Sequence, residues 1–231
     1  MPSMQQLANV QGVIFDMDGL LLDTERLFKK AYQRSASQHG IVLEDSVYDM
    51  MIGLRSDASQ RVLREQLGPN APSAAIIEGA RHYYYMQIEE EGIPLRPGVL
   101  EMFDYVESLG FPMAVATSTH HELAMIKLRV VGLLERVVGI VSGDQVAKGK
   151  PEPDIFLAAA KLIGVPPENC LALEDSPPGV IAARKAECVT IMVPDLQAPN
   201  AVTRSMANFI HASLHEVVEA LKEARAAEAA T

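Results

Sequence analysis

Short apolar runs alternate with helix-like stretches along most of this chain. The runs are rich in Val, Ile and Leu and are nearly continuous in apolar character, which is typical of strands buried on both faces of a parallel sheet. Repeated strand and helix units of this kind predict an α/β fold built on a doubly wound parallel sheet. The predicted strands are Val13–Phe15, Pro112–Ala116, Val137–Val141, Cys170–Leu173, Val189–Val193 and Phe209–Ile210.

The alternation is interrupted after the first strand. Residues 23–92 have helical spacing, with glycines between the helical stretches and no convincing strand. We therefore predict that an all-α domain at 23–92 is inserted into the sheet domain. The sheet domain is then discontinuous and comprises residues 1–22 and 93–231.

Charge and cysteine content restrict the partners and the compartment. Thirty acidic and twenty basic side chains give a formal net charge of -10, which repels a nucleic-acid backbone and an anionic membrane surface alike. No stretch reaches the roughly 18 uninterrupted apolar residues of a membrane span. Cys170 and Cys188 are too few for a disulfide framework or a thiolate metal cluster. We expect a cytoplasmic protein, a monomer or a weak homodimer, that binds neither nucleic acid nor membrane.

The first predicted strand ends in an acidic segment, Asp16-Met17-Asp18-Gly19. Folds of this class place their chemistry at the carboxyl ends of the strands. An aspartate that lies beside a second acid can be held ionised by a divalent cation and can attack phosphorus directly. The alternative is that both acids only turn or cap the chain. On this segment alone the two interpretations are about equal.

Polar groups also follow three other predicted strands. Thr117 and Ser118 precede a helix, where hydroxyls and backbone amides can bind phosphate. Lys150 lies in a loop with two prolines and could neutralise a phosphoryl group, and Glu174 and Asp175 place two more acids at a strand end. Each feature alone is more typical of a helix cap or a solvated loop. Together, however, the four strand ends favour one phosphoryl-transfer site.

Acids at two neighbouring strand ends repel one another unless a cation lies between them. Oxygen ligands without a His or Cys cluster favour a hard ion, and a site that also contacts phosphate favours Mg²⁺ over Ca²⁺. The sequence therefore predicts Mg²⁺ as the cofactor.

These motifs resemble those of the haloacid dehalogenase (HAD) superfamily over nearly the whole chain. The segment Phe15-Asp16-Met17-Asp18-Gly19-Leu20-Leu21 is similar to its first motif. Thr117, Lys150 and Glu174-Asp175 are similar to the next three, in matching order and spacing. The helical insertion is similar to the cap of the subgroup that contains β-phosphoglucomutase and many small-metabolite phosphatases. The resemblance implies a Rossmann-like core with a mobile four-helix cap above the active site.

The resemblance also implies roles for the two aspartates of the first motif. Asp16 would be the nucleophile that forms an aspartyl-phosphate. Asp18 would protonate the leaving oxygen and later act as the base on the hydrolytic water. Because a leaving halide needs no proton donor, an aspartate at this second position disfavours dehalogenation.

The remaining motif residues would bind the phosphoryl group and the metal ion. By the resemblance, Thr117 and the Ser118 amide would donate to phosphate oxygens, and Lys150 would hold both the nucleophile and the phosphate. Catalysis would then consist mostly of in-line placement and charge neutralisation. The implied metal residues are Asp16, Asp18 through its carbonyl, Asp175, and Glu174, which would orient a metal-bound water.

A segment in the insertion separates phosphatase from mutase. In β-phosphoglucomutases a cap loop carries a lysine before a glycine and an arginine three residues beyond that glycine. Here Ile52 precedes Gly53, and Arg55 comes one position early. This departure favours a phosphatase. Arg55 could still contact a polar group of the substrate, with an ordinary surface arginine as the equal alternative.

We therefore expect a Mg²⁺-dependent phosphatase that hydrolyses a phosphomonoester of a small metabolite, such as a sugar phosphate. A phosphosugar mutase is the alternative, and it would give an isomeric product instead of free phosphate. A non-catalytic phosphoaspartate signalling module similar to response-regulator receivers is disfavoured. Those domains carry their aspartate at a later strand end and have no helical insertion.

Overall fold

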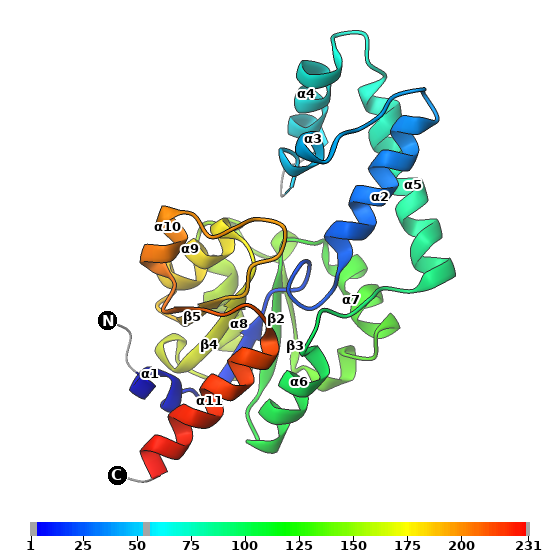
Figure 1. Ribbon diagram of the computed structural model, residues 1–231. Coiled ribbons are helices and arrows are strands. Elements are labelled where there is room, and N and C mark those ends of the chain that lie inside the picture. Colours follow the sequence, from blue (N-terminus) through cyan, green and yellow to red (C-terminus); the bar gives the residue numbers. More distant parts are fainter. Residues whose placement is uncertain (1–3, 53–55, 230–231) are drawn as a thin grey trace. The chain divides into compact units, whose positions relative to one another are not determined.

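The computed structural model describes residues 4–52 and 56–229 (Figure 1). The chain divides into two compact units. The core unit comprises Met1–Leu22 and Pro94–Thr231, and the helical unit comprises Asp23–Ile93. Ile93 therefore belongs to the helical unit, one residue beyond the boundary that the sequence predicts.

A six-stranded sheet forms the centre of the core unit, in the order β3-β2-β1-β4-β5-β6. Each pair of neighbouring strands is parallel. The strands are β1 Gly12–Phe15, β2 Met113–Thr117, β3 Gly139–Ser142, β4 Cys170–Glu174, β5 Val189–Met192 and β6 Phe209–Ile210. The predicted α/β fold with a parallel sheet is confirmed. Because the strand order reverses between β1 and β4, the carboxyl ends of these two strands form the topological switch point at which such sheets bind ligands.

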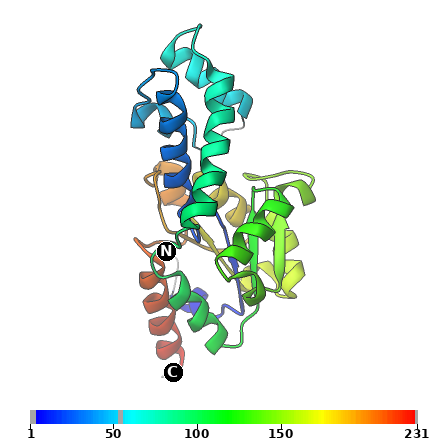
Figure 2. The same cartoon turned by 90° about the vertical axis from the view of Figure 1, so that its right-hand side faces the viewer.

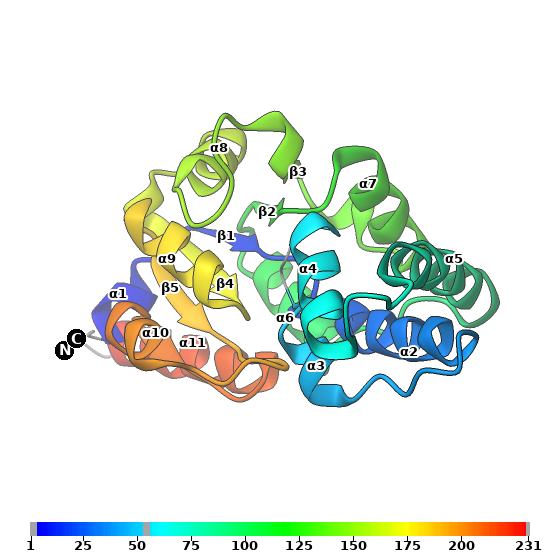
Figure 3. The same ribbon diagram turned by 90° about the horizontal axis from the view of Figure 1, so that it is seen from above.

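Helices cover both faces of this sheet (Figure 3). On one face, α8 and α9 pack against an apolar cluster that includes Ile14, Phe156 and Ala172. On the other, α6 packs beside α11, which in turn contacts α1, and Phe103 of α6 stacks on Phe15 of β1 with ring centroids 4.8 Å apart. The helices of this unit are α1 Met4–Ala8, α6 Val99–Ser108, α7 His121–Val130, α8 Asp154–Ile163, α9 Pro177–Lys185, α10 Ala201–Met206 and α11 Leu214–Ala229. All residues of β1, β2 and β4 are buried, which explains why their sequences are continuously apolar.

The described part of the helical unit consists of four helices and their connections. They are α2 Thr24–Ser37, α3 Asp45–Asp49, α4 Ser56–Leu67 and α5 Ser73–Glu91. The two long helices, α2 and α5, run side by side (Figure 2). They are joined by Phe28, which stacks on Tyr84 with ring centroids 3.8 Å apart, and by Ser35, whose hydroxyl donates to the Ile76 carbonyl at 2.8 Å. The predicted all-α insertion is confirmed.

None of the helices in residues 4–52 and 56–229 has the length and apolar character that a membrane span requires.

Candidate active site

Asp16 follows β1 directly, at the switch point of the sheet. The strand register places Phe15 opposite both Val115 and Leu173. The next residue of each strand therefore lies at the same level, so that Asp16 is flanked by Ala116 of β2 and Glu174 of β4. The Asp16 backbone amide also donates to the Leu173 carbonyl at 3.0 Å, which fixes the start of the loop after β1.

Lys150 links these three strand ends. Its Nζ donates to Asp16 Oδ1 at 2.5 Å, to Glu174 Oε1 at 2.5 Å and to the Ala116 carbonyl at 3.0 Å. The side chains of Lys150, Asp16 and Glu174 are 5%, 9% and 0% exposed, respectively. A lysine is rarely buried unless it is paired, so these contacts explain why this loop lysine is not solvated.

Three carboxylates gather around this lysine. Asp16, Glu174 and Asp175 each place a carboxylate oxygen within 4.8 Å of the other two, and we call these three residues the acid cluster. Two glycines leave room for it. Gly19 has a φ of +90°, and a Cβ added there would lie 2.3 Å from Asp175 Oδ2. A Cβ at Gly179 would meet the Glu174 carboxylate within about 2 Å.

The three carboxyl groups of the acid cluster share one lysine, and their pKa values respond to this crowding. Burial raises the pKa of Asp16 to about 8; Lys150 opposes this rise, and the neighbouring Glu174 adds to it. Burial, followed by the charges of Asp16 and Glu174, also raises the pKa of Asp175 well above its ordinary value. Burial pushes the pKa of Lys150 down, but the two adjacent acids outweigh burial and raise it. One lysine therefore does not balance three carboxylates, and this oxygen donor set fits a hard divalent cation such as Mg²⁺.

Asp18 has different partners from those of the acid cluster. Its Oδ1 accepts a hydrogen bond from Lys127 Nζ at 2.7 Å, and its Oδ2 accepts one from Thr119 Oγ1 at 2.6 Å. Lys127 lies on α7 with a side chain that is 4% exposed, whereas the Asp18 side chain is 21% exposed. We call Asp18, Thr119 and Lys127 the Asp18 group.

Sequence reasoning missed the roles of Thr119 and Lys127. A signal for Lys127 does exist, because Ala124, Lys127 and Leu128 are the buried residues of α7. They lie three and four positions apart and so form the apolar stripe of the helix. A lysine in such a stripe requires an acidic partner.

The hydroxyl segment follows β2 as predicted. Thr117 is the last residue of that strand and is buried, and its Oγ1 accepts a hydrogen bond from the Thr119 amide at 3.1 Å. Ser118 is exposed. Because the Lys150 amine bonds to the carbonyl of Ala116, the hydroxyl segment begins next to the residues that hold Asp16.

The structure thus brings most of the predicted site residues to one edge of the sheet. Asp16, Lys150, Glu174 and Asp175 are close together, and Asp18 is tied to the hydroxyl segment through Thr119. Arg55, which the sequence suggests as a substrate-binding residue, lies outside the described residues.

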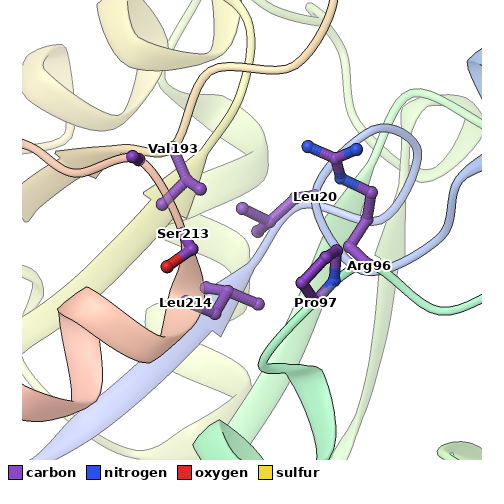
Figure 4. Close-up of a pocket in the computed structure, with 7 residues that line it drawn as sticks. Leu20, Arg96, Pro97, Val193, Ser213 and Leu214 are labelled. Atoms are coloured by element: carbon purple, nitrogen blue, oxygen red, sulfur yellow. The ribbon is translucent and has the colours of Figure 1, made fainter.

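A separate small pocket opens beside the connection that returns to the core unit (Figure 4). The side chains of Leu20, Val193 and Leu214 converge there, next to Arg96 and Pro97. The guanidinium of Arg96 forms an ion pair with the buried carboxylate of Asp195 at 2.9 Å. No predicted site residue lines this pocket, and its lining contains no carboxylate that could act as nucleophile or metal ligand.

Comparison with known proteins gives consistent matches. A family model described as haloacid dehalogenase-like hydrolase matches residues 10–187. A phosphorylated carbohydrates phosphatase of Thermotoga maritima is 34% identical over 177 residues, which cover 77% of this chain and 82% of that protein. Hexitol phosphatase A of Escherichia coli is 31% identical over 183 residues, which cover 79% of this chain and 82% of that protein. The crystal structure of a HAD family hydrolase from Deinococcus radiodurans R1, with bound phosphate and sodium, has a TM-score of 0.82 and 27% identity and covers 94% of this chain and 97% of that chain.

Proposed function

Because this chain belongs to the haloacid dehalogenase-like hydrolases, we propose that the acid cluster and the Asp18 group form the active site of a phosphatase that acts on a small phosphorylated metabolite. The enzyme class, phosphoric monoester hydrolase, is that of its named relatives. The observation that carries the site assignment is the contact of Lys150 with both Asp16 and Glu174 at the switch point of the sheet.

Asp16 is the proposed nucleophile. One of its carboxylate oxygens attacks phosphorus, the bond between phosphorus and the ester oxygen breaks, and an aspartyl-phosphate forms. Lys150 holds Asp16 Oδ1 at 2.5 Å and so fixes the direction of attack. Its positive charge also favours the ionised nucleophile and opposes the effect of burial on the pKa of Asp16.

Asp18 is the proposed general acid and base. Asp18 must be protonated when the substrate binds, and it gives this proton to the ester oxygen as the alcohol leaves. It then takes a proton from the water that attacks the aspartyl-phosphate, so that the bond between Asp16 and phosphorus breaks and phosphate is released. Its carboxylate lies only two residues from the nucleophile and contacts groups outside the acid cluster, so one loop carries both functions.

Mg²⁺ is the proposed cofactor. Asp16, Asp175 and the carbonyl of Asp18 would hold it, with Glu174 orienting a bound water. When bound, the ion would neutralise charge on the phosphoryl oxygens and on the carboxylates around Lys150. The close packing of Gly19 on Asp175 supports this assignment, because it keeps the loop backbone near the carboxylate.

Thr117 and the Ser118 amide are the proposed donors to the phosphoryl oxygens. They follow β2 and precede α7, where backbone amides at a helix start favour an anion. The bound phosphate of the Deinococcus radiodurans hydrolase supports a phosphate site in this fold. Arg55 stays a proposed contact to the polar part of the substrate, and we propose that the helical unit acts as a mobile cap.

The proposed substrates are phosphorylated carbohydrates, the class named for the Thermotoga maritima relative. We further propose that the enzyme works in the cytoplasm as a monomer or weak homodimer. A mutase stays the alternative, because it would use the same phosphorylated aspartate.

The test is a screen of sugar phosphates and hexitol phosphates with added Mg²⁺, in which released phosphate and isomeric products are both measured. We expect free phosphate in stoichiometric amount with the dephosphorylated sugar. The matched control is Asp16→Asn, whose amide cannot attack phosphorus and which should lower kcat by about 10³-fold or more. An isomeric sugar phosphate without free phosphate would replace the phosphatase by the mutase. Full activity of Asp16→Asn would contradict the assignment of Asp16 as the nucleophile and of this cluster as the active site.

A further inference from the structure

We propose that Lys127 is a positioning residue that holds the carboxylate of Asp18 in the direction needed for proton transfer to the leaving alcohol. This inference rests on the proposed function, in which Asp18 is the general acid. Thr119 has the same role, because its hydroxyl donates a hydrogen bond to the other carboxylate oxygen of Asp18. Neither residue belongs to the motifs by which the sequence resembles its family.

The first argument is the burial of a lysine on an apolar helix face. Lys127 shares its stripe with Ala124 and Leu128, both of which are fully buried. An ammonium at such a position is unfavourable unless a charge meets it. The Nζ of Lys127 lies 2.7 Å from Asp18 Oδ1, although the two residues are 109 positions apart in the sequence. The helix therefore brings a charged group to one carboxylate of the loop after β1.

The second argument is that both oxygens of Asp18 are held, each by a different element. Lys127 on α7 bonds to Oδ1, and Thr119 in the segment after β2 bonds to Oδ2 at 2.6 Å. Two bonds to the two oxygens fix the plane of the carboxylate, which a single bond would leave free to rotate. The Thr119 amide donates in turn to Thr117 Oγ1 at 3.1 Å. Thr119 therefore connects Asp18 to the segment that is proposed to bind phosphate.

The third argument concerns the reaction step that this hold would affect. As the bond between phosphorus and the ester oxygen breaks, that oxygen becomes an alkoxide unless it receives the proton of Asp18. An alkyl alcohol is a poor leaving group and depends strongly on this proton, whereas para-nitrophenolate leaves readily without it. Misplacing Asp18 should therefore slow the hydrolysis of alkyl phosphates more than that of para-nitrophenyl phosphate. If Lys127 were needed only for folding, its replacement would slow the hydrolysis of both esters alike.

The experiment compares kcat/KM of Lys127→Met for para-nitrophenyl phosphate and for a sugar phosphate that the wild type hydrolyses. This parameter reports the steps up to release of the alcohol, so hydrolysis of the aspartyl-phosphate does not enter. We expect kcat/KM for the sugar phosphate to fall about tenfold or more beyond the fall for para-nitrophenyl phosphate. Lys127→Arg should restore part of the difference, because its guanidinium can still donate to Asp18.

Two controls isolate the effect. Arg129→Met removes an exposed cation from the same helix and should leave kcat/KM unchanged for both esters. In an Asp18→Asn background, Lys127→Met should cause no further selective loss, because a residue that acts through Asp18 has nothing left to position. If Lys127→Met does not fold, Thr119→Val removes the other hydrogen bond to Asp18 and should cause the same selective loss of kcat/KM for the sugar phosphate.

Each outcome decides the proposal. Equal slowing of the two esters, or a full additional loss in the Asp18→Asn background, would overturn the role of Lys127 and leave the phosphatase assignment intact. Absence of phosphate release by the wild type from every ester would overturn both proposals.

Discussion

The acid cluster and the Asp18 group begin two residues apart in one loop, yet their electrostatic environments are opposite. In the acid cluster, Asp16, Glu174 and Asp175 depend on a single lysine, Lys150. In the Asp18 group, one carboxylate has a lysine and a threonine hydroxyl on its two oxygens. The first has three carboxyl groups for one lysine, whereas the second has one carboxyl group for one lysine and one hydroxyl.

This difference separates two requirements of phosphoryl transfer. The nucleophile must be ionised beside a negatively charged phosphate, which a buried cluster achieves only with additional positive charge. The proton donor must be aimed at the leaving oxygen, which requires fixed hydrogen bonds and no added ion. We therefore expect the acid cluster to respond to metal and pH, and the Asp18 group to respond to the leaving group.

The largest contrast should appear when each lysine is replaced by methionine. Lys150→Met leaves Asp16 and Glu174 buried without their cation, and the loss of one partner from a buried ion pair lowers the free energy of unfolding by about 3–5 kcal/mol. Lys127→Met leaves Asp18 with Thr119 and with access to water, because its side chain is 21% exposed. A loss of about 1–2 kcal/mol is expected there. Urea unfolding of the two variants without added metal measures the difference.

Equal losses for the two lysines would contradict the comparison, because they would mean that the two carboxylate sites depend equally on their cations. Lys161→Met serves as the reference for replacing an exposed lysine on a helix, and it should lie within about 0.5 kcal/mol of the wild type.

A second contrast concerns pH and Mg²⁺. The folded pKa of Asp16, about 8, lies above the value of 3.8 for an unperturbed aspartate. Folding therefore favours the protonated acid, and the stability from this group is full at acidic pH and is lost as the pH rises toward 8. Because Mg²⁺ requires the ionised carboxylates, the increase in melting temperature that 10 mM Mg²⁺ produces, of the order of a few degrees, should be larger at pH 8.5 than at pH 6.

The matched variants assign this effect to one region. Asp16→Asn should weaken the dependence of the Mg²⁺-induced shift on pH, because the group with the raised pKa is gone. Asp18→Asn retains all three acids of the cluster and should preserve most of that dependence. A shift that is the same at both pH values in the wild type would mean that ion binding is not linked to the ionisation of Asp16. The absence of any shift would mean that the folded protein does not bind the ion.

The strands and the acid cluster could be predicted from the sequence for a common physical reason. Strands that are buried on both faces are continuously apolar, and the carboxyl ends of parallel strands meet at one edge. Polar residues that follow such runs, like Asp16 and Glu174, must therefore come together. The short helices α1 and α10 were not predicted. They have few residues and depend on contacts from distant segments, such as the packing of α1 on α11.

The position of Lys127 in an apolar stripe indicates that it needs an acidic partner, but it does not identify Asp18 as that partner, because the strand periodicity ends before Asp18. Side chains two apart share a face only within a strand, but β1 ends at Phe15 and the loop turns at Gly19 with a φ of +90°. Asp16 and Asp18 therefore meet different elements.

The smallest effect on stability should accompany a selective effect on the acid cluster. A Cβ at Gly179 would meet the Glu174 carboxylate within about 2 Å, so this carboxylate, the far end of a flexible side chain, must shift away from its partners Lys150 and Ser176. In Gly179→Ala, the better helix propensity of alanine, worth about 1 kcal/mol, should offset much of the strain. Displacing Glu174 should nevertheless weaken Mg²⁺ affinity by about 10- to 100-fold, as for other residues that orient a metal site.

Gly149→Ala is the matched control for this last variant, because a Cβ at Gly149 meets nothing within 4 Å although it adjoins Lys150. Its Mg²⁺ affinity, measured by titration calorimetry alongside that of Gly179→Ala, should equal that of the wild type. A large stability loss in Gly179→Ala with unchanged Mg²⁺ affinity would show that Glu174 only holds the fold together. Weaker Mg²⁺ binding at nearly unchanged stability would instead indicate that the position of the Glu174 carboxylate contributes to Mg²⁺ affinity.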